Sequence, residues 1–376
     1  MGLAVSYNAP LFVLSILILL NGILRARVEP AEELHDAALL HDLVRAADPL
    51  ANPDVRDEST RPSYRPTRLV ELATSHCVLP AVARLLRSAG AQSPDDREAT
   101  RTVDYHLGFL TAQRMILAAH AERILRDLSD QPVTMVKGGT FSSLLYPAPR
   151  LRSYSDVDLL VDPAVSTRVM EVMRANGFVR FSGPSAPDRH EEKWTLAHDA
   201  TVLVEVHTDM VHAPSLRNSL SLRYEDLASV GARTPAAQLV IASVHAALHQ
   251  FDTLRQIVDV LQAARNLTAA ADEERLEFLV QRTGARLATV AALDLANRMY
   301  GDRRCIEIRR SLQPAPYARI ARALISPKVA VNSQTSRRLQ HRWRRQCFRE
   351  ALKRSRIAEA FLHPLPQRKH PNETAP

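Results

Sequence analysis

The stretch KGGTFSSLLYPAPRLRSYSDVDLLV, residues 137–161, sets the expectations for the fold. It follows PVTMV (132–136), a short segment rich in β-forming residues, which predicts a strand that ends just before the pair Gly138-Gly139. FSSLL then resumes helical spacing, and SDVDLLV alternates polar and apolar residues as a half-buried strand does. The stretch therefore predicts a strand, a glycine turn, a helix and a second strand.

The second predicted strand carries two acidic residues two positions apart. Side chains alternate across a strand, so Asp156 and Asp158 share one face while the apolar residue between them faces the core. The later segment TVLVEVHTDM (201–210) alternates in the same way and places Glu205 and His207 on one face. This later strand could bring a third carboxylate to the aspartate pair.

Three neighbouring carboxylates repel one another unless cations lie between them, and hard oxygen ligands suit Mg²⁺ or Mn²⁺. Such metals neutralise a triphosphate and stabilise the leaving pyrophosphate in an in-line displacement. Asp156, Asp158 and Glu205 are therefore the predicted metal ligands and catalytic acids.

An enzyme that transfers a phosphoryl or nucleotidyl group with such metals also needs groups that hold phosphates. The glycine pair at the start of a helix offers exposed N–H groups and the positive end of the helix dipole. Hydroxyl groups and two cations stand close by in the sequence. The predicted nucleotide-binding residues are Lys137, Gly138, Gly139, Thr140, Arg152 and Ser155, with Ser142 and Ser143 as further donors.

Each part has a simpler interpretation. A D-x-D pattern alone is more often a solvated strand face than a metal site, and a Gly-Gly pair is a weak signal. The order of the parts carries more weight, because a glycine turn, a D-x-D strand and a later strand with a central Glu rarely occur together by chance.

These residues resemble the DNA polymerase beta-type nucleotidyltransferases, whose signature is a Gly-Gly or Gly-Ser turn, then D-x-D or D-x-E, then a third acid. The stretch looks especially similar to a branch of uncharacterised bacterial nucleotidyltransferases. The similarity extends more loosely over residues 67–302. The matching positions are Lys137, Gly138, Tyr146, Pro147, Arg152, Asp156, Asp158, Glu205 and His207, with His245, His249, Arg255 and Asp259 on a later helical stretch.

The resemblance implies transfer of a nucleoside monophosphate from an NTP, with ATP favoured, to an acceptor. It implies that Asp156 and Asp158 bind metal and that Glu205 helps to deprotonate the acceptor. Two positions depart from the branch. The third acid is usually Asp, and Thr208 follows His207 where an aromatic residue is common. These departures weaken the expectation for the substrate side more than that for the metal.

Two histidines four residues apart, His245 and His249, share a helix face. Ala246 stands where a zinc protease motif has Glu, and no third ligand is evident, so a zinc site is disfavoured. We expect packed or pocket-lining side chains, with His249 and His207 as possible pocket residues.

The fold class expected is α+β, with a small mixed-sheet nucleotidyltransferase core between N- and C-terminal helical blocks. Ala, Leu and Arg dominate and aromatic residues make up 5%, which favours helices over a large antiparallel sheet. The expected regions are an apolar helix, second helix and linker (1–66), a helical region (67–130), the core (131–212), a second helical region (213–302), and a basic helical extension with a disordered end (303–376).

Charge is unevenly distributed along the chain. Residues 301–376 hold 18 Lys and Arg against 5 Asp and Glu, although the whole chain has a net charge of +8. The basic segment 337–356 contains Trp343 and Phe348 among arginines, so it could bind nucleic acid, or it could pack as an amphipathic helix with a solvated basic face. Packing is the favoured interpretation.

Localisation is expected to be cytoplasmic, because the 3 cysteines are far apart and form no C-x-x-C pair. The apolar segment from Pro10 to Leu24 is shorter than the ~20 residues of a spanning helix, and no Lys or Arg precedes it as in a signal peptide. A membrane anchor is therefore a minor possibility.

Two other functions remain open from the sequence. A catalytically inactive relative could serve as a binding module, and a kinase-like enzyme could use the same metals but release ADP where a nucleotidyltransferase releases pyrophosphate. The acceptor could be a small molecule, a peptide or protein, or a tRNA, because acceptor pockets lie in variable loops and helices.

Overall fold

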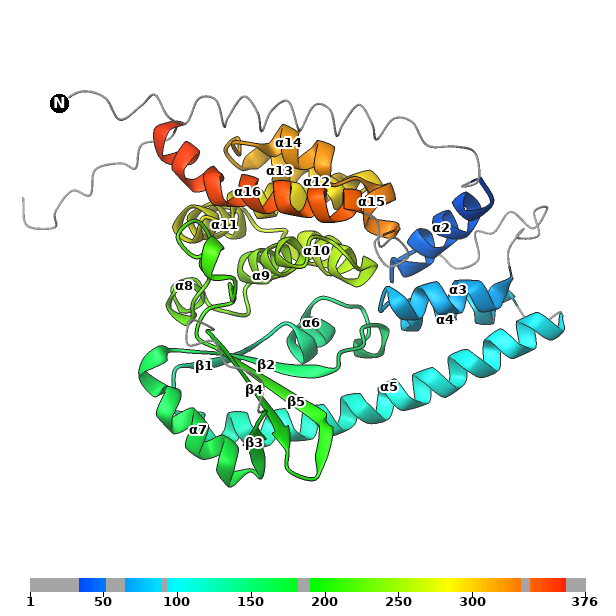
Figure 1. The fold of residues 1–376 in the computed structure, drawn as a ribbon, viewed down its shortest axis with the longest axis horizontal. Coiled ribbons are helices and arrows are strands. Elements are labelled where there is room, and N and C mark those ends of the chain that lie inside the picture. The colour runs from blue at the N-terminus through cyan, green and yellow to red at the C-terminus, as the bar shows by residue number, and fades with distance from the viewer. Residues whose placement is uncertain (1–33, 52–64, 90–92, 182–189, 333–338, 363–376) are drawn as a thin grey trace, which may run out of the picture.

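The computed structural model describes residues 34–51, 65–89, 93–181, 190–332 and 339–362. A sheet with helices on one side forms one part, and a stack of helices covers its other side (Figure 1). This arrangement confirms the α+β class, with helical blocks before and after the sheet.

The first helical block ends in a helix long enough to reach both parts of the molecule. Its 34 residues begin at Pro94, directly after the N-cap residue Ser93, and the side chains of Ser93 and Asp96 cap each other's backbone N–H groups. Near its start, Ala99 and Val103 join the core of the helical stack, while Leu117 and later residues pack beneath the sheet. The helices of this block are α2 (Leu34–Ala47), α3 (Pro66–Ser75), α4 (Leu79–Ala89) and α5 (Pro94–Asp127).

The five strands form one mixed sheet in the order β1-β2-β5-β4-β3. β2 and β5 are parallel neighbours, whereas the other pairs are antiparallel. The register places Asp158 opposite Glu205, and Glu205 opposite Lys193. The strands are β1 (Val133–Val136), β2 (Asp156–Val161), β3 (Phe178–Arg180), β4 (Glu191–Leu196) and β5 (Asp199–His207).

One face of the sheet is apolar and packs on α5 and α7 (Ser166–Ala175). Val157 and Leu159, the apolar residues that alternate with the aspartates, are buried there as the strand pattern predicted. Trp194 of β4 is also buried in this cluster. The polar residues of the same strands therefore lie on the opposite face, toward α6 (Gly138–Leu144) and the helical stack.

The second helical block surrounds α9, in which eleven of fourteen residues are buried. The buried residues of this block and of α2–α4 form one continuous cluster, so the two blocks share a core. Its helices are α8 (Tyr224–Ala228), α9 (Pro235–Leu248), α10 (Leu254–Asn266), α11 (Ala270–Thr283), α12 (Arg286–Tyr300), α13 (Arg303–Ser311), α14 (Ala318–Leu324), α15 (Pro327–Val331) and α16 (Leu339–Leu362).

The basic segment 337–356 lies mostly in α16, which packs on this block. Phe348 is buried and its ring meets Phe251 at a centroid distance of 5.8 Å. Ala351 and Leu352 are buried beside it. The prediction that this segment packs as an amphipathic helix is therefore confirmed. The basic side chains between the buried residues belong to the same folded helix.

No helix among the described residues is long and apolar enough to cross a membrane. The apolar segment from Pro10 to Leu24, considered as an anchor, lies outside the described residues, as does the expected disordered end after residue 362.

Candidate active site

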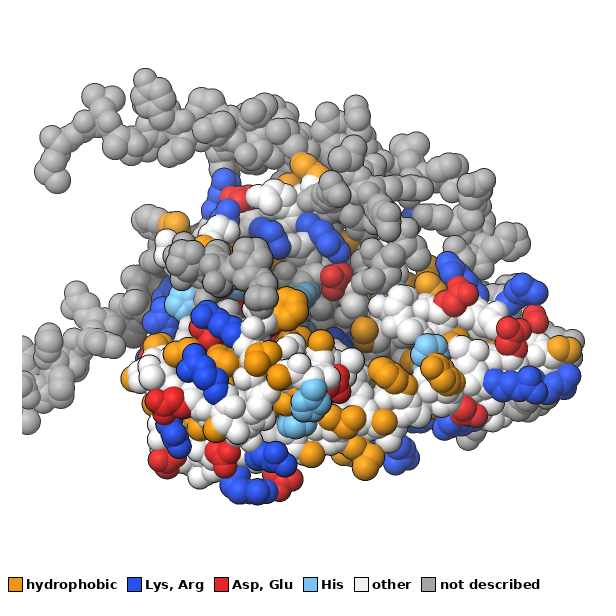
Figure 2. Space-filling model, turned by 60° about the horizontal axis from the view of Figure 1, so that its bottom comes forward, with side chains coloured by type: hydrophobic (Ala, Val, Ile, Leu, Met, Phe, Trp, Pro, Cys, Tyr) orange, Lys and Arg blue, Asp and Glu red, His pale blue; other side chains and the backbone are white. Residues whose placement is uncertain are grey.

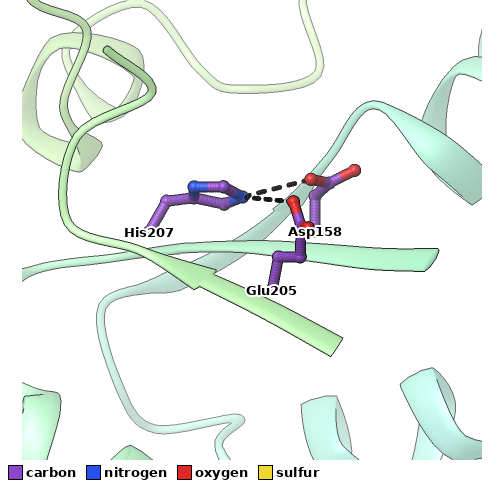
Figure 3. Close-up of side chains that lie close together, drawn as sticks. All are labelled: Asp158, Glu205 and His207. Atoms are coloured by element: carbon purple, nitrogen blue, oxygen red, sulfur yellow. Dashed lines mark hydrogen bonds and ion pairs between the residues drawn. The ribbon is translucent and has the colours of Figure 1, made fainter. Parts of the chain in front are cut away.

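The acidic face of the sheet brings together side chains from β2 and β5. Single ligand atoms of Asp158, Glu205 and His207 all lie within 4.8 Å of one another (Figure 3). The imidazole Nε2 of His207 is 3.1 Å from Asp158 Oδ1 and 3.6 Å from Glu205 Oε2. Two carboxylates and an imidazole thus converge where adjacent parallel strands place them side by side, and they could hold a divalent cation.

The sequence pattern did not anticipate His207 as a direct member of this group. It predicted that His207 and Glu205 share a strand face, but it treated the histidine as a pocket residue. The signal was present, because Glu205 and His207 are two apart on one strand, as Asp156 and Asp158 are.

Lys137 is a buried cation that contacts the carboxylate of Asp158. Its Nζ lies 2.6 Å from Asp158 Oδ1, and its side chain is almost fully buried. Burial alone would lower the pKa of Lys137, but the charge of Asp158 outweighs it and the pKa is raised. Burial would raise the pKa of Asp158, whereas Lys137 and His207 together hold it well below its usual range. Both groups are therefore charged at neutral pH.

The backbone at Lys137 is strained. Its φ of 53° and ψ of −139° lie in a region that side-chain-bearing residues rarely adopt, and the cost of such a conformation is about 1–3 kcal/mol. Gly138 follows with a φ of +30°, and a Cβ on it would lie 3.2 Å from the carbonyl oxygen of Asp156. Because Gly138 has no side chain, the turn can lie close to β2. This close approach places the strained Lys137 next to Asp158.

Lys193 of β4 approaches the carboxylates from the other side. Its Nζ lies 2.5 Å from Glu205 Oε1 and 3.0 Å from Glu191 Oε1. Glu191 is opposite His207 in the register, so its carboxylate belongs to the same face. Among the described residues, the acidic face therefore has four carboxylates and two lysines beside them: Asp156, Asp158, Glu191 and Glu205, with Lys137 and Lys193.

The ionised form of Asp156 is disfavoured in the folded protein. Burial first, and then the neighbouring charge of Asp158, raise its pKa from 3.8 to about 6. Lys137 opposes this rise, but it is hydrogen-bonded to Asp158. Asp156 is outside the three-residue group described above, although it lies on the same strand face. A cation would relieve the repulsion between the two aspartates.

Replacement of Asp156 by asparagine is expected to stabilise the metal-free protein. In the unfolded chain the carboxyl ionises near pH 4, whereas in the folded protein it keeps its proton up to about pH 6. Ionisation above pH 6 thus costs the folded state as much as about 3 kcal/mol, which the amide avoids. Urea unfolding in EDTA should show the gain at pH 8, and the gain should disappear as the pH falls toward 4. An unchanged or lowered stability at pH 8 would contradict this electrostatic account.

Arg152 forms a buried ion pair with Asp259 of α10. It was expected beside the phosphates, but its Nε and Nη2 donate to the two carboxylate oxygens of Asp259 at 2.7 and 2.8 Å, and its Nη1 donates to the Gly138 carbonyl at 2.9 Å. The Tyr146 hydroxyl also donates to Asp259, at 2.8 Å. Both charged side chains are buried. Arg152 therefore ties the glycine turn to α10 in this structure.

The hydroxyl groups expected at the phosphates are also engaged. Thr140 Oγ1 donates to the Met135 carbonyl at 3.0 Å, Ser142 Oγ to the Pro149 carbonyl at 2.7 Å, and Ser143 Oγ to the Thr140 carbonyl at 3.1 Å. Gly139 packs against Tyr154, whose hydroxyl would lie 3.3 Å from an added Cβ. Ser155 is exposed immediately before Asp156.

A group of histidines borders the acidic face on the side of α9. The rings of His249 and His245 are 4.7 Å apart, and those of His249 and His212 are 6.5 Å apart, between centroids. Burial lowers the pKa of His212 and holds that of His245 well below its usual range. Among the described atoms, the buried Nδ1 of His207, His212 and His245 has no hydrogen-bond partner. The rings of His212 and His245, whose pKa values are lowered by burial, could receive polar groups of a substrate.

The comparisons with known proteins agree with this geometry. A family model described as an uncharacterised nucleotidyltransferase matches residues 62–301. No curated protein and no solved structure matches the chain. The matched range contains the glycine turn, the acidic face, the histidine group and the Arg152–Asp259 pair. Since it also covers more than half of the chain, the protein belongs to this family of uncharacterised nucleotidyltransferases.

Proposed function

We propose that this protein is a metal-dependent nucleotidyltransferase of the DNA polymerase beta type, which transfers a nucleoside monophosphate from an NTP to a hydroxyl acceptor. The observation that carries the proposal is the convergence of Asp158, Glu205 and His207 within 4.8 Å on adjacent strands of a nucleotidyltransferase-family chain. ATP is the favoured donor, and the acceptor is a small molecule, a peptide or protein, or a tRNA.

The donor atoms suit a divalent cation of the Mg²⁺ or Mn²⁺ class. Carboxylate oxygens are the ligands that both ions prefer, and an imidazole nitrogen is accepted more readily by Mn²⁺. We assign Asp156 and Asp158 as the principal ligands, with Glu205 and His207 beside them. The bound ion would neutralise the triphosphate and stabilise the charge that develops on the leaving pyrophosphate.

The chain's own groups then have distinct tasks. The hydroxyl oxygen of the acceptor attacks the α-phosphorus of the NTP, and Glu205 accepts the proton of that hydroxyl. The bond between the α-phosphorus and the pyrophosphate oxygen breaks on the opposite side. Lys193 forms an ion pair with Glu205 at 2.5 Å and so holds that carboxylate in position. Lys137 supplies positive charge beside the phosphates, and the backbone of Gly138 and Gly139 lines the approach to them.

The acceptor is expected on the histidine side. His212, His245 and His249 lie at the edge of the acidic face, where His212 Nδ1 is 3.8 Å from Glu191 Oε2, and the Nδ1 of His245, which has no hydrogen-bond partner among the described atoms, could bind a hydroxyl group. His207 connects this side with the metal ligands, because its ring contacts Asp158 and Glu205. The acceptor hydroxyl would therefore reach Glu205 from this direction.

The test measures nucleotide binding and the phosphorus product together. Calorimetric titration of each NTP in Mn²⁺ or Mg²⁺ should give micromolar binding, and cell extract as the acceptor source should yield labelled pyrophosphate from γ-labelled NTP. Glu205→Gln should abolish pyrophosphate release. Glu192→Gln should not, because Glu192 belongs to the same sheet but pairs with Arg180. No NTP binding by the intact protein would favour a binding module, and release of a nucleoside diphosphate would show phosphoryl transfer instead.

A further inference from the structure

The long helix α5 has two faces with different environments. One face is buried, first in the helical stack through Ala99 and Val103 and then beneath the sheet through Leu117, Ala121 and Ile124. The other face points away from the molecule. It carries large hydrophobic side chains that are strongly exposed: Tyr105 at 76%, Phe109 at 58% and Ile116 at 46%. Figure 2 looks onto this side and shows hydrophobic groups scattered along it.

These exposed residues belong to a regular seam. Counting from Glu98, positions separated alternately by four and three residues fall on one stripe of a helix, which is the pattern of a coiled coil. All of them are exposed except Thr102, which is half-buried. The seam consists of Glu98, Thr102, Tyr105, Phe109, Ala112, Ile116, Ala119 and Arg123.

The seam is complementary to itself when its direction is reversed. The spacing between successive seam positions alternates between four and three residues, and it is four at both ends. The order of spacings is therefore the same in either direction along the helix. An antiparallel copy would place Phe109 against Ala112, Tyr105 against Ile116 and Glu98 against Arg123. Large side chains thus meet smaller ones, and opposite charges meet at both ends. A parallel copy would instead place each glutamate against its own equivalent.

We propose that the protein forms a two-fold symmetric dimer in which α5 of one copy packs antiparallel on α5 of the other. An isologous contact of this kind requires one self-complementary patch, and the seam provides it. Phe109 and Tyr105 are the apolar anchors, while Glu98 and Arg123 at the rim fix direction and register. The acidic face of the sheet lies on the side opposite α5, so this contact does not involve it.

The first test is sedimentation velocity of the full chain over a range of concentrations. The intact protein should dimerise, and Phe109→Glu should weaken the dimer by at least about 100-fold, since the substitution enters the interface twice. Thr111→Glu is the matched control, because this exposed residue lies on the same helix but outside the seam. Circular dichroism should show both variants folded. A monomeric intact protein, or a dimer indifferent to Phe109→Glu, would overturn the proposal.

The second test addresses the antiparallel register. Glu98→Arg and Arg123→Glu should each weaken the dimer several-fold, because each leaves like charges opposite one another at both ends. The double variant should return to within about 2-fold of the intact protein, since the charges are then exchanged but still complementary. If the double variant is weaker than either single variant, the two residues do not face each other and the antiparallel register is wrong.

Discussion

Replacement of Asp158 by asparagine is expected to lower the rate of pyrophosphate release by about 100- to 1,000-fold, the scale of losing a group that stabilises transition-state charge. Asp158 is buried, and it is the described carboxylate that both Lys137 and His207 contact. An amide is a poorer metal ligand and carries no charge to balance them. Mn²⁺ affinity, measured by calorimetry, should fall together with the rate.

The same substitution should also reduce stability at neutral pH, because the buried ammonium group of Lys137 loses its closest partner. The pKa of Asp158 is held low, so its contribution to stability is present above the carboxyl's ordinary range near pH 4 and is lost as the pH falls below that range. Rates must therefore be compared below the unfolding temperature of the variant.

Asp162→Asn is the matched control for Asp158→Asn. Asp162 directly follows the same strand, but its side chain is half-buried and accepts a hydrogen bond from the Ala164 N–H. This hydrogen bond caps the short helix Pro163–Val165, away from the metal ligands. Asp162→Asn should therefore keep both the rate and Mn²⁺ binding. If Asp158→Asn, folded and tested at the same temperature, retained a tenth or more of the rate, Asp158 would not be a ligand of the catalytic metal.

Local patterns in the sequence predicted the strands of the core well, because a half-buried strand exposes its period directly. The alternation in SDVDLLV correctly separated buried Val157 and Leu159 from the aspartates. The juxtaposition of Asp158 and Glu205 could only be suggested, since it depends on β2 and β5 being parallel neighbours in a definite register. That register is set by the whole sheet and not by either strand alone.

The environment of charged and hydroxyl side chains was harder to predict. Arg152 was expected at the phosphates because it is a cation near the glycine turn, yet its partner Asp259 lies 107 positions away. The hydroxyl of Thr140 was expected to bind nucleotide, whereas in this structure it donates to the Met135 carbonyl. A sequence pattern shows which residues can donate or carry charge. It does not show which buried acceptor must be satisfied after the chain folds.

Loss of Arg152 is expected to destabilise the fold strongly, although this residue was first assigned to the nucleotide. Arg152→Met leaves the carboxylate of Asp259 buried with the Tyr146 hydroxyl, and breaking a buried pair by removing one partner costs about 3–5 kcal/mol. The Gly138 carbonyl also loses its donor. Thermal and urea unfolding should show the loss, and Arg150→Met is the matched control because Arg150 is exposed two residues earlier.

The double variant Arg152→Met/Asp259→Leu separates a structural role from a direct role in nucleotide binding. Removing both charges should recover much of the stability lost by either single change, because no buried charge is then left without a partner. If Arg152 only ties the glycine turn to α10, NTP affinity should recover along with stability. If Arg152 contacts a phosphate after a rearrangement, affinity should stay low in the stable double variant, and the arginine would regain the role that its position in the sequence suggested.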